Sequence, residues 1–333
     1  MQTILVTGGA GFIGSNFIAY YLAKNNNCTI VNLDKLTYAA DIKNLREVDN
    51  NASYKFIHGD ICDKQLLINI FKEYKFKGII HFAAESHVDN SIENPSEFIN
   101  TNIVGTHNLL EVAKLFWIDN PETSNKQNRF LHVSTDEVYG SLKETGFFTE
   151  NTPYAPNSPY SASKAASDFL VRSYHHTFRL NVVTTNCSNN FGPKQHDEKL
   201  IPTVIRKALN NEKIPIYGTG KNVRDWLYVE DHCKAIDLVY QNGKSGETYI
   251  IGANNEYTNL KIADMVCEIL DANLTKEESY KKQISFVEDR LGHDFRYAID
   301  ATKIKNELGW KPMQNFKESL EKTVFWYLNK YRN

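Results

Sequence analysis

The stretch that decides the fold is Thr7-Gly8-Gly9-Ala10-Gly11-Phe12-Ile13-Gly14, which joins an apolar run, Thr3 to Thr7, to an amphipathic segment that begins at Phe12. Its glycines match the G-x-G-x-x-G pattern that links the first strand of a βαβ unit to the next helix. Glycines permit a tight turn and close backbone approach, so a pyrophosphate can bind free N–H groups at the helix N-terminus. The stretch therefore predicts a dinucleotide site at Gly8, Gly11, Phe12, Ile13 and Gly14.

An acidic residue at the expected distance strengthens this prediction, because a glycine pattern alone is weak. Asp34 stands 20 residues after Gly14, at the end of the apolar run Thr29 to Leu33. A carboxylate there accepts hydrogen bonds from ribose hydroxyls and repels a 2′-phosphate. NAD is therefore the predicted cofactor in preference to NADP, although the neighbouring cation, Lys35, points the other way.

Short apolar runs alternate with longer amphipathic segments through the first half of the chain. Strands are expected at Thr3 to Thr7, Thr29 to Leu33, Tyr54 to His58, Gly78 to Phe82, Arg129 to Ser134 and Asn181 to Asn186. Helices are expected at Phe12 to Asn25, Lys64 to Tyr74, Ser96 to Phe116 and Tyr160 to Thr177. This alternation is typical of a parallel sheet with right-handed crossover helices. We expect an α/β fold of the Rossmann type, a doubly wound parallel sheet.

The pattern becomes less regular after about residue 190, with more Gly, Asn and charged residues. Helices are expected near Lys199 to Leu209, Asp231 to Tyr240, Leu260 to Leu270 and Phe316 to Leu328. We expect a smaller mixed α/β lobe that binds substrate, with the Asp231 helix and a strand at Glu247 to Ile251 returning to the sheet. The expected NAD-binding domain is 1–189 with a return at about 228–252, and the substrate-binding domain is 190–227 with 253–333.

Composition excludes several classes of function. With 41% hydrophobic and 23% charged residues, the chain is globular and neither disordered nor fibrous. A formal net charge of −2 gives no general attraction for nucleic acid or anionic lipid. No apolar run approaches the ~20 residues that span a bilayer. The cysteines form no C-x-x-C pair, which argues against structural zinc and a disulfide framework. We expect a cytoplasmic, metal-free protein with a small-molecule ligand and no membrane or nucleic-acid partner.

The segment Tyr160-Ser161-Ala162-Ser163-Lys164 places a phenol and an ammonium four residues apart, hence on one face of a helix. An ordinary tyrosine has a pKa near 10, so its use as a base at pH 7 requires lowering the pKa by about three. Lys164 and a nicotinamide cation together are expected to supply this effect. Together with the glycine stretch, the pair predicts proton and hydride transfer.

The acid pair Asp136-Glu137 follows Ser134-Thr135 at the carboxyl end of a predicted buried strand, where open α/β sheets bind ligands. Two carboxyl groups in one pocket push their pKa values apart, which leaves one protonated as an acid and one ionised as a base. On spacing alone, however, a solvated loop with two acids is the better explanation.

Taken together, the motifs resemble the extended short-chain dehydrogenase/reductase family, in its nucleotide-sugar branch. The motifs that carry the resemblance run in order through nearly the whole chain: Thr7 to Gly14, His81 to Asp89, Ser134 to Gly140, Tyr160 to Lys164, Thr185 to Pro193, Asn222 to Trp226 and Asp289 to Asp294. The glycine and Tyr/Lys motifs are shared by the whole superfamily. Thr135-Asp136-Glu137 before Val138-Tyr139-Gly140 resembles the 4,6-dehydratases of this branch, because sister epimerases and decarboxylases usually lack the acid pair.

This resemblance implies a redox-neutral loss of water from dTDP-glucose, with NAD as cofactor. Tyr160 would take the C4 hydroxyl proton while hydride leaves C4, and Lys164 would assist it. Glu137 would then remove the C5 proton, Asp136 would protonate the departing C6 hydroxyl, and Thr135 would hold the C4 oxygen. Hydride return to C6 and reprotonation of C5 then give a 4-keto-6-deoxy sugar. The resemblance thus implies that the acid pair is catalytic, whereas spacing alone favoured a solvated loop.

The resemblance also implies two sets of binding residues. Beyond the glycine stretch and Asp34, the cofactor set is Asp60, Ile61, Ala83, Ala84, Ser86, Thr101, Tyr160, Lys164 and Asn190. The substrate set is Ser86, His87, Thr135, Asn189, Lys199, Leu200, Pro215, Ile216, Tyr217, Arg224, Asn259, Arg290 and His293. Four positions depart from the family pattern: Asn90, Phe191, Lys194 and Leu291, of which Leu291 adjoins Arg290.

Two other functions remain open on the sequence. One is a 4,6-dehydratase or 4-epimerase acting on a UDP, CDP or GDP sugar, and the other is an NAD-binding regulator without chemistry. The acid pair argues against the epimerase, and the presence of both Tyr160 and Lys164 argues against the regulator. The segments Ser96 to Phe116 and Tyr160 to Thr177 carry apolar residues on more than one face, which fits either burial within one chain or a partner subunit. The family resemblance implies a homodimer built from paired helices.

Overall fold

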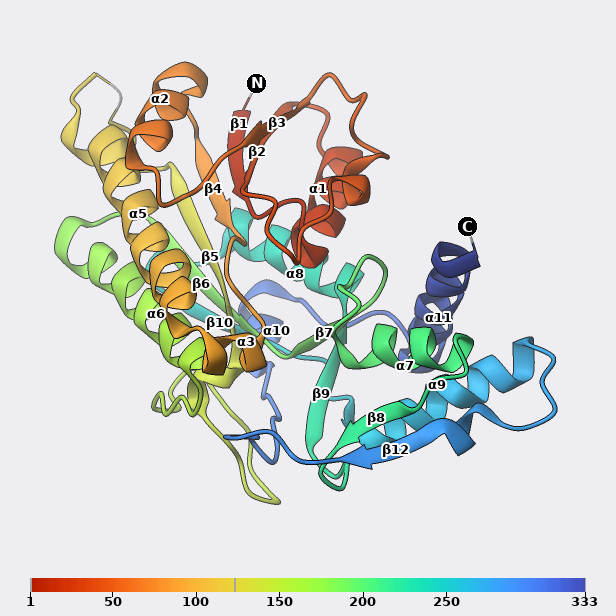
Figure 1. Cartoon of the computed structure of the whole chain (residues 1–333). Coiled ribbons are helices and arrows are strands. Elements are labelled where there is room, and N and C mark those ends of the chain that lie inside the picture. Colours follow the sequence, from red (N-terminus) through yellow and green to blue (C-terminus); the bar gives the residue numbers. More distant parts are fainter. Residues whose placement is uncertain (1, 123, 333) are drawn as a thin grey trace.

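A computed structural model describes residues 2–122 and 124–332. Within this part of the chain, seven parallel strands form the main sheet in the order β10-β6-β5-β4-β1-β2-β3 (Figure 1). Their bounds are β1 Gln2–Thr7, β2 Cys28–Asp34, β3 Tyr54–His58, β4 Gly78–His81, β5 Arg129–Thr135, β6 Val182–Cys187 and β10 Thr248–Ile251. The strand order runs outward from β1 in both directions, so the expected doubly wound Rossmann-type sheet is confirmed.

Alternate strand residues are buried on opposite faces of this sheet. Ile4 and Val6 of β1 pack with α1 (Phe12–Lys24) and α8 (Val229–Asn242), whereas Leu5 packs with the helices of the other face. Those helices are α2 (Lys64–Tyr74), α5 (Thr106–Lys114) and α6 (Pro159–Phe178). Both faces are thus covered, which explains why the strands read as continuous apolar runs.

One predicted helix is a composite. The run from 95 to 119 consists of α4 (Pro95–Phe98), α5 and two π-helical segments, Ile99–Gly105 and Leu115–Asp119. The first π-helical segment contains Asn102, whose buried side chain bonds to the Glu85 backbone and to Ser163 of α6. Periodicity near 3.6 residues indicates a helix but does not reveal a π turn, because the π turn depends on such tertiary bonds.

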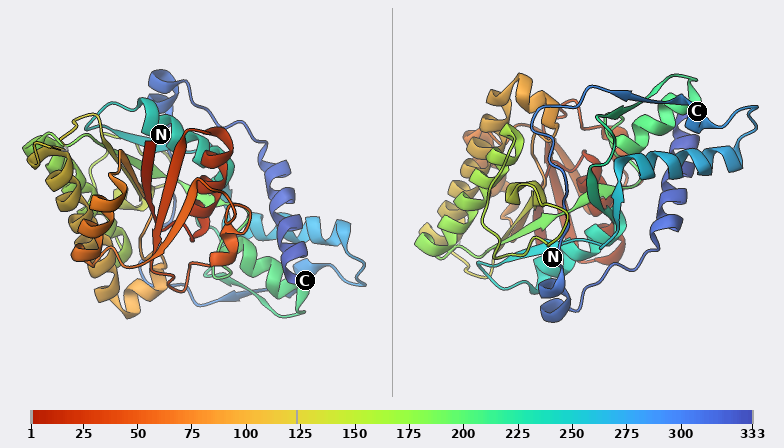
Figure 2. Two further views of the ribbon diagram at one scale, coloured as in Figure 1. Left: turned by 90° about the horizontal axis from the view of Figure 1, so that it is seen from above. Right: turned by 90° about the horizontal axis from the view of Figure 1, so that it is seen from below.

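The later half of the chain supplies the second lobe and also the edge of the first. The second lobe contains α7 Leu200–Leu209, β8 Ile214–Tyr217, α9 Asn259–Asn273, β12 Ile284–Val287 and α11 Phe316–Arg332 around one core. Three short strands, β7 Asn189–Phe191, β9 Val223–Tyr228 and β11 Glu256–Thr258, form a small sheet between the lobes (Figures 1 and 2). The remaining helix of the first lobe, α3 (Val88–Glu93), lies just before α4.

Three late elements pack with the first lobe. Strand β10 pairs with β6, and α8 packs with α1, as in the expected return at about 228–252. The helix α10 (Thr302–Leu308) joins them, because Ile304 and Trp310 belong to the same apolar cluster as α8. We propose the domain division 1–189 with 228–252, and 190–227 with 253–333, except that α10 belongs with the first core.

Candidate active site

The glycine stretch forms the turn between β1 and α1. Gly8 has φ of +72°, and a Cβ there would lie 2.5 Å from the backbone nitrogen of Ala83, so only glycine fits. A Cβ on Gly14 would lie 2.4 Å from the Gly8 carbonyl oxygen. Gly11 caps α1, and no side chain caps the first-turn N–H groups. These closely packed, uncapped amides fit a pyrophosphate.

Asp34 ends β2 beside this turn. Its two carboxylate oxygens accept hydrogen bonds from the backbone N–H groups of Ala10 and Leu36, both at 2.8 Å. Each oxygen retains a lone pair for a ribose hydroxyl. The neighbouring Lys35 ammonium lies 2.9 Å from an Asp60 oxygen. Lys35, the cation that argued for NADP, is therefore paired with Asp60, which agrees with the prediction of NAD.

Gly8→Ala is expected to abolish measurable NAD binding, because the added methyl group collides with the Ala83 backbone. Isothermal titration calorimetry with NAD, together with a thermal melt, measures the effect. Gly309→Ala is the matched control, since Gly309 has the same φ of +72° and a Cβ there meets nothing within 4 Å. Both variants carry the left-handed strain of about 1 kcal/mol. Undiminished NAD binding by Gly8→Ala would show that the turn between β1 and α1 does not hold the pyrophosphate of NAD.

Most of the predicted site residues line a single cleft at the carboxyl edge of the sheet. All the predicted cofactor residues line it: Gly8, Gly11, Phe12, Ile13, Gly14, Asp34, Asp60, Ile61, Ala83, Ala84, Ser86, Thr101, Tyr160, Lys164 and Asn190. Thr135, Asp136, Glu137, Asn189 and Lys199 line the same cleft. The structure thus brings the glycine turn and the acid pair together.

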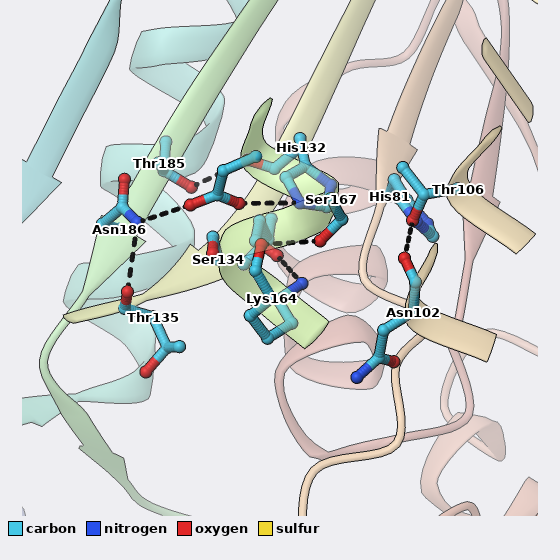
Figure 3. A network of polar contacts seen from close by, with 12 residues as sticks. His81, Asn102, Thr106, His132, Ser134, Thr135, Lys164, Ser167, Thr185 and Asn186 are labelled. Atoms are coloured by element: carbon cyan, nitrogen blue, oxygen red, sulfur yellow. Dashed lines mark hydrogen bonds and ion pairs between the residues drawn. The ribbon is translucent and has the colours of Figure 1, made fainter. Parts of the chain in front are cut away.

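Tyr160 and Lys164 lie on one face of α6, whose N-terminus is capped by Ser158 and Ser161 in a reciprocal capping box. Lys164 Nζ donates to the Val133 carbonyl oxygen at 2.9 Å (Figure 3). Burial first, and then the Glu137 carboxylate, raise the pKa of Tyr160 well above its ordinary value. In the protein alone the pKa of the phenol is therefore not lowered toward neutrality, because burial and the neighbouring carboxylates outweigh the hydrogen bond with Thr135.

The acid pair lies in a 3₁₀ turn, Asp136–Tyr139, which directly follows β5. Thr135 caps the turn, since its hydroxyl oxygen accepts from the Glu137 backbone N–H at 3.3 Å. Asp136 is 1% exposed, and its Oδ2 has no hydrogen-bond partner within the described residues. The turn lets two adjacent residues face one cleft, which a continued strand would prevent.

The two carboxyl groups of the turn have different electrostatic surroundings. Burial first, and then the carboxylates of Glu137 and Asp225, raise the pKa of Asp136 well above its ordinary range. Burial also raises the pKa of Glu137, but Arg290, Arg224 and Lys199 oppose this effect. The environment therefore favours Asp136 as the proton donor and Glu137 as the ionised base.

Arg224 of β9 is held rigidly in the second lobe. Its guanidinium donates to the carbonyl oxygens of Val223 at 2.7 Å and Asp294 at 2.9 Å, and it lies 4.1 Å from the centre of the Tyr297 ring. No carboxylate hydrogen-bonds to it within the described residues, so the charge is available to an anion.

Arg290 extends this positive surface. Its Nη1 lies 3.9 Å from Asp89 of the first lobe, to which Tyr217 also donates at 3.4 Å. His293 packs edge-on against Tyr217 and lies 2.6 Å from Asp289.

The remaining predicted substrate residues lie outside the residues that line the cleft. His87 caps α3 through its ring nitrogen, and Leu200 and Asn259 begin α7 and α9. Pro215 and Ile216 belong to β8, where the Ile216 side chain is buried in the second core. Like Tyr217, Arg224, Arg290 and His293, these four belong to the second lobe, whereas His87 belongs to the first, and the contact of all of them with substrate stays a prediction.

Several cleft residues were not predicted. The cleft is also lined by Leu33, Lys35, Thr37, Ala39, Ala40, Gly59, Phe82, Glu85, Val133, Ser134, Cys187, Ser188, Gln195, His196 and Glu198. Glu198 lies 3.4 Å from Lys199 Nζ and from His196, and 3.7 Å from His87. The loop that holds Glu198 carries no motif. The grouping of Glu198 with Lys199, His196 and His87 is therefore visible only in the folded chain. No arrangement of three or more His, Cys, Asp or Glu side chains suited to a metal ion occurs among the described residues.

The four departures from the family pattern have separate structural settings. Phe191 is fully buried and packs against Tyr228 and Phe316 of the second core. Lys194 pairs with Glu47, and the backbone N–H of Asn90 donates to the His87 ring. Leu291 is 76% exposed beside Arg290. None of the four lines the cleft.

The fold and the cleft indicate the class of protein. It is a Rossmann-type enzyme that binds a dinucleotide beside a tyrosine, a lysine and two carboxyl groups. A family model described as GDP-mannose 4,6 dehydratase matches residues 5–323. A dTDP-glucose 4,6-dehydratase of Xanthomonas campestris is 54% identical over 330 residues, which are 98% of this chain and 93% of that protein. The chain therefore belongs to the GDP-mannose 4,6 dehydratase family, and within it to the dTDP-glucose 4,6-dehydratases.

Solved structures agree with this assignment. The dTDP-glucose 4,6-dehydratase of Bacillus anthracis, in complex with NAD, is 45% identical with a TM-score of 0.88, covering 100% of this chain and 98% of that one. The Streptomyces venezuelae enzyme DesIV, of the same name and also with NAD bound, is 43% identical with a TM-score of 0.91, covering 99% and 98%. The predicted family and the Rossmann-type fold are thereby confirmed.

Proposed function

We propose that the chain converts dTDP-glucose to dTDP-4-keto-6-deoxyglucose and water, with NAD restored in each cycle. The observation that carries this function is the acid pair Asp136-Glu137, which shares one cleft with Tyr160 and the glycine turn. An epimerase needs no acid and base at C6 and C5, and a regulator needs neither the acid pair nor the Tyr/Lys pair. Relatives of the same name over nearly the full chain support the choice.

Oxidation at C4 is assigned to Tyr160, with Thr135 and Lys164 beside it. Tyr160 takes the C4 hydroxyl proton, Thr135 holds the C4 oxygen, and Lys164 contributes positive charge. When bound, NAD⁺ supplies the hydride acceptor, and its positive charge favours the phenolate that burial disfavours. The proposed cofactor residues all line the cleft: Gly8, Gly11, Phe12, Ile13, Gly14, Asp34, Asp60, Ile61, Ala83, Ala84, Ser86, Thr101, Tyr160, Lys164 and Asn190.

Elimination is assigned to the two carboxyl groups. The C4 ketone acidifies the C5 proton, which Glu137 removes because three cations favour its ionised form. Asp136 protonates the departing C6 hydroxyl, because burial and nearby carboxylates keep it in the acid form. The pair thus divides acid and base work between two neighbouring residues.

The nucleotide diphosphate is assigned to the second lobe. Arg224 and Arg290 suit phosphate oxygens, because their guanidinium forks are not engaged by bidentate carboxylates among the described residues. The other proposed contacts are Ser86, His87, Asn189, Lys199, Leu200, Pro215, Ile216, Tyr217, Asn259 and His293.

The deciding experiment incubates the protein and NAD⁺ with dTDP-, UDP-, CDP- or GDP-glucose in D₂O, followed by mass spectrometry. We expect loss of water and gain of one solvent deuterium with dTDP-glucose alone, because C5 is reprotonated from an exchangeable carboxyl group. Water loss from another nucleotide sugar would overturn the substrate and keep the mechanism. Interconversion without water loss would support the epimerase, and no turnover would support the regulator.

A homodimer through α5 and α6 is proposed on the basis of exposed apolar side chains. Ile99, Val104 and Leu115 on the 95–119 run are at least 42% exposed, and Phe169 of α6 is 57% exposed. Phe169→Asp is expected to shift the protein from dimer to monomer in sedimentation equilibrium, because the charge would be buried at the interface. Phe286→Asp, at a residue 56% exposed on β12, is the control that should remain dimeric. A dimeric Phe169→Asp variant would place the interface elsewhere.

A cytoplasmic location is also proposed. All five cysteines are free thiols, and four of them are buried, which suits a reducing compartment. In the described part of the chain, no helix combines the length and apolar character that crossing a bilayer requires.

A further inference from the structure

A buried carboxylate lies beneath the Tyr160/Lys164 face, one helical turn beyond Lys164 on α6. Asp168 is 4% exposed, and its Oδ2 accepts hydrogen bonds from Tyr154 at 2.9 Å and from Asn186 at 3.0 Å. Its Oδ1 lies 3.1 Å from His132 Nε2. Asn186 belongs to β6 and His132 to β5, so two strands and α6 meet at this carboxylate; Figure 3 labels these two partners of Asp168. Neither the cofactor residues nor the proposed proton transfers use it.

Asn186 connects this carboxylate to the catalytic turn. The same Nδ2 donates its second hydrogen to the Thr135 carbonyl oxygen at 3.1 Å (Figure 3). Thr135 in turn caps the turn that carries Asp136 and Glu137. One buried amide therefore ties α6, which carries Tyr160 and Lys164, to Thr135, the residue that caps the acid-pair turn.

Asp168 also acts on the Lys164 ammonium, one helical turn away on α6: burial lowers the pKa of Lys164, and the Asp168 carboxylate opposes this effect. The other titratable groups around this ammonium are His81 of β4, His132 of β5 and Cys187 of β6. Burial lowers the pKa of both histidines, His132 to about 4, and raises the pKa of Cys187 to about 12, so all three are neutral at pH 7. Burial likewise raises the pKa values of Tyr139 and Tyr154, which face Asp168. Among these groups, Asp168 is the carboxyl group, and it opposes the effect of burial on the Lys164 ammonium.

We propose that Asp168 is a positioning residue for the dehydratase reaction: through Asn186 it fixes the Thr135-Asp136-Glu137 turn, and it provides the counter-charge for the Lys164 ammonium. The inference rests on the proposed function, because it assigns a purpose only if Tyr160, Lys164 and the acid pair perform the chemistry. It adds a residue that touches neither sugar nor cofactor. It also explains why a carboxylate stays buried between two strands and a helix.

Asp168→Asn tests the charge while it keeps the size and an acceptor oxygen for Asn186 and Tyr154. A buried ammonium without its counter-ion loses its proton at lower pH. The high-pH limb of kcat/KM for dTDP-glucose should therefore move down by about one to two pH units. Tyr154→Phe keeps the charge and removes one hydrogen bond, so its high-pH limb should match that of the wild type.

Asp237→Asn is the matched control for the loss of a buried carboxylate. Asp237 of α8 is 2% exposed and lies 2.7 Å from Lys24 Nζ, outside the residues that line the cleft. This variant should lower the melting temperature and leave the pH profile unchanged. If Asp168→Asn also kept the wild-type profile, the counter-charge role would be overturned.

Asn186→Ala tests the connection to the turn and remains informative if Asp168→Asn does not fold. Tyr160 and Lys164 stay in place, so C4 oxidation, which needs only Thr135 from the displaced turn, should slow less than elimination, which needs both of its carboxyl groups. Bound NADH should therefore accumulate, and product formation should fall by about tenfold or more. Equal slowing of both steps, without bound NADH, would overturn the positioning role. Inactivity of the wild type toward every nucleotide sugar would instead refute the proposed function.

Discussion

Glu137→Gln is expected to stop the reaction after the first hydride transfer, so that bound NADH accumulates and turnover falls by about 10²–10⁴-fold. The glutamine keeps the size of the side chain and the hydrogen bond from the residue 137 N–H to Thr135, but it cannot accept the C5 proton. Tyr160 is untouched, so oxidation at C4 can still occur. Absorbance of reduced cofactor in rapid mixing with dTDP-glucose, followed by mass spectrometry, measures both steps.

The control for this prediction is solvent exchange at C5. The variant should incorporate no deuterium from D₂O into recovered sugar, because that exchange requires the missing base. Wild-type turnover by Glu137→Gln would remove Glu137 from the mechanism. Loss of activity without bound NADH would mean that this residue acts before or during C4 oxidation.

Tyr160→Phe is expected to lose both bound NADH and product, again by about 10²–10⁴-fold, because no base remains for the C4 hydroxyl. Phenylalanine preserves the ring and its packing against Phe98, so the fold should persist. Single-turnover mixing with dTDP-glucose measures NADH formation, and calorimetry measures retained binding of NAD and substrate.

Tyr240→Phe is the matched control for the loss of a buried hydroxyl. Tyr240 lies on α8, where its hydroxyl accepts from Gln2 and stands outside the residues that line the cleft. This control should retain wild-type turnover. Near-normal NADH formation in Tyr160→Phe would show that another group takes the C4 proton.

The main sheet was predictable because its signals are local. The glycine turn fixes β1 and α1, and α2 and β3 have the same bounds in sequence and structure, Lys64–Tyr74 and Tyr54–His58. The short strands β7, β8, β9, β11 and β12 were not predicted, because they contain three to six residues and pair with distant segments. Their formation depends on tertiary contacts that periodicity does not report.

The candidate site, like the fold, could be predicted from the sequence only in part. Asp34 follows the glycine stretch at a fixed spacing in one βαβ unit, so their position together beside the cleft could be predicted from the sequence, whereas the other proposed cofactor residues came from the family resemblance. Glu198 and Asp168 reach the site through contacts between remote elements and carried no motif. The acid pair needed the family resemblance, because spacing alone favoured a solvated loop. The high pKa of Tyr160 was not foreseen, since it depends on the degree of burial.

The path of the chain through α8, β10 and α10 has a consequence for how the protein is made. A ribosome releases β1 to β6 first, yet β6 stays an open sheet edge until β10 emerges, and Ile304 of α10 follows still later. Nascent chains that stop short of β10 therefore expose the β6 strand edge, and those that stop short of α10 expose the apolar surface beneath it. The first lobe can complete its core only after α10 has left the ribosome, so shorter nascent chains are the ones prone to aggregation.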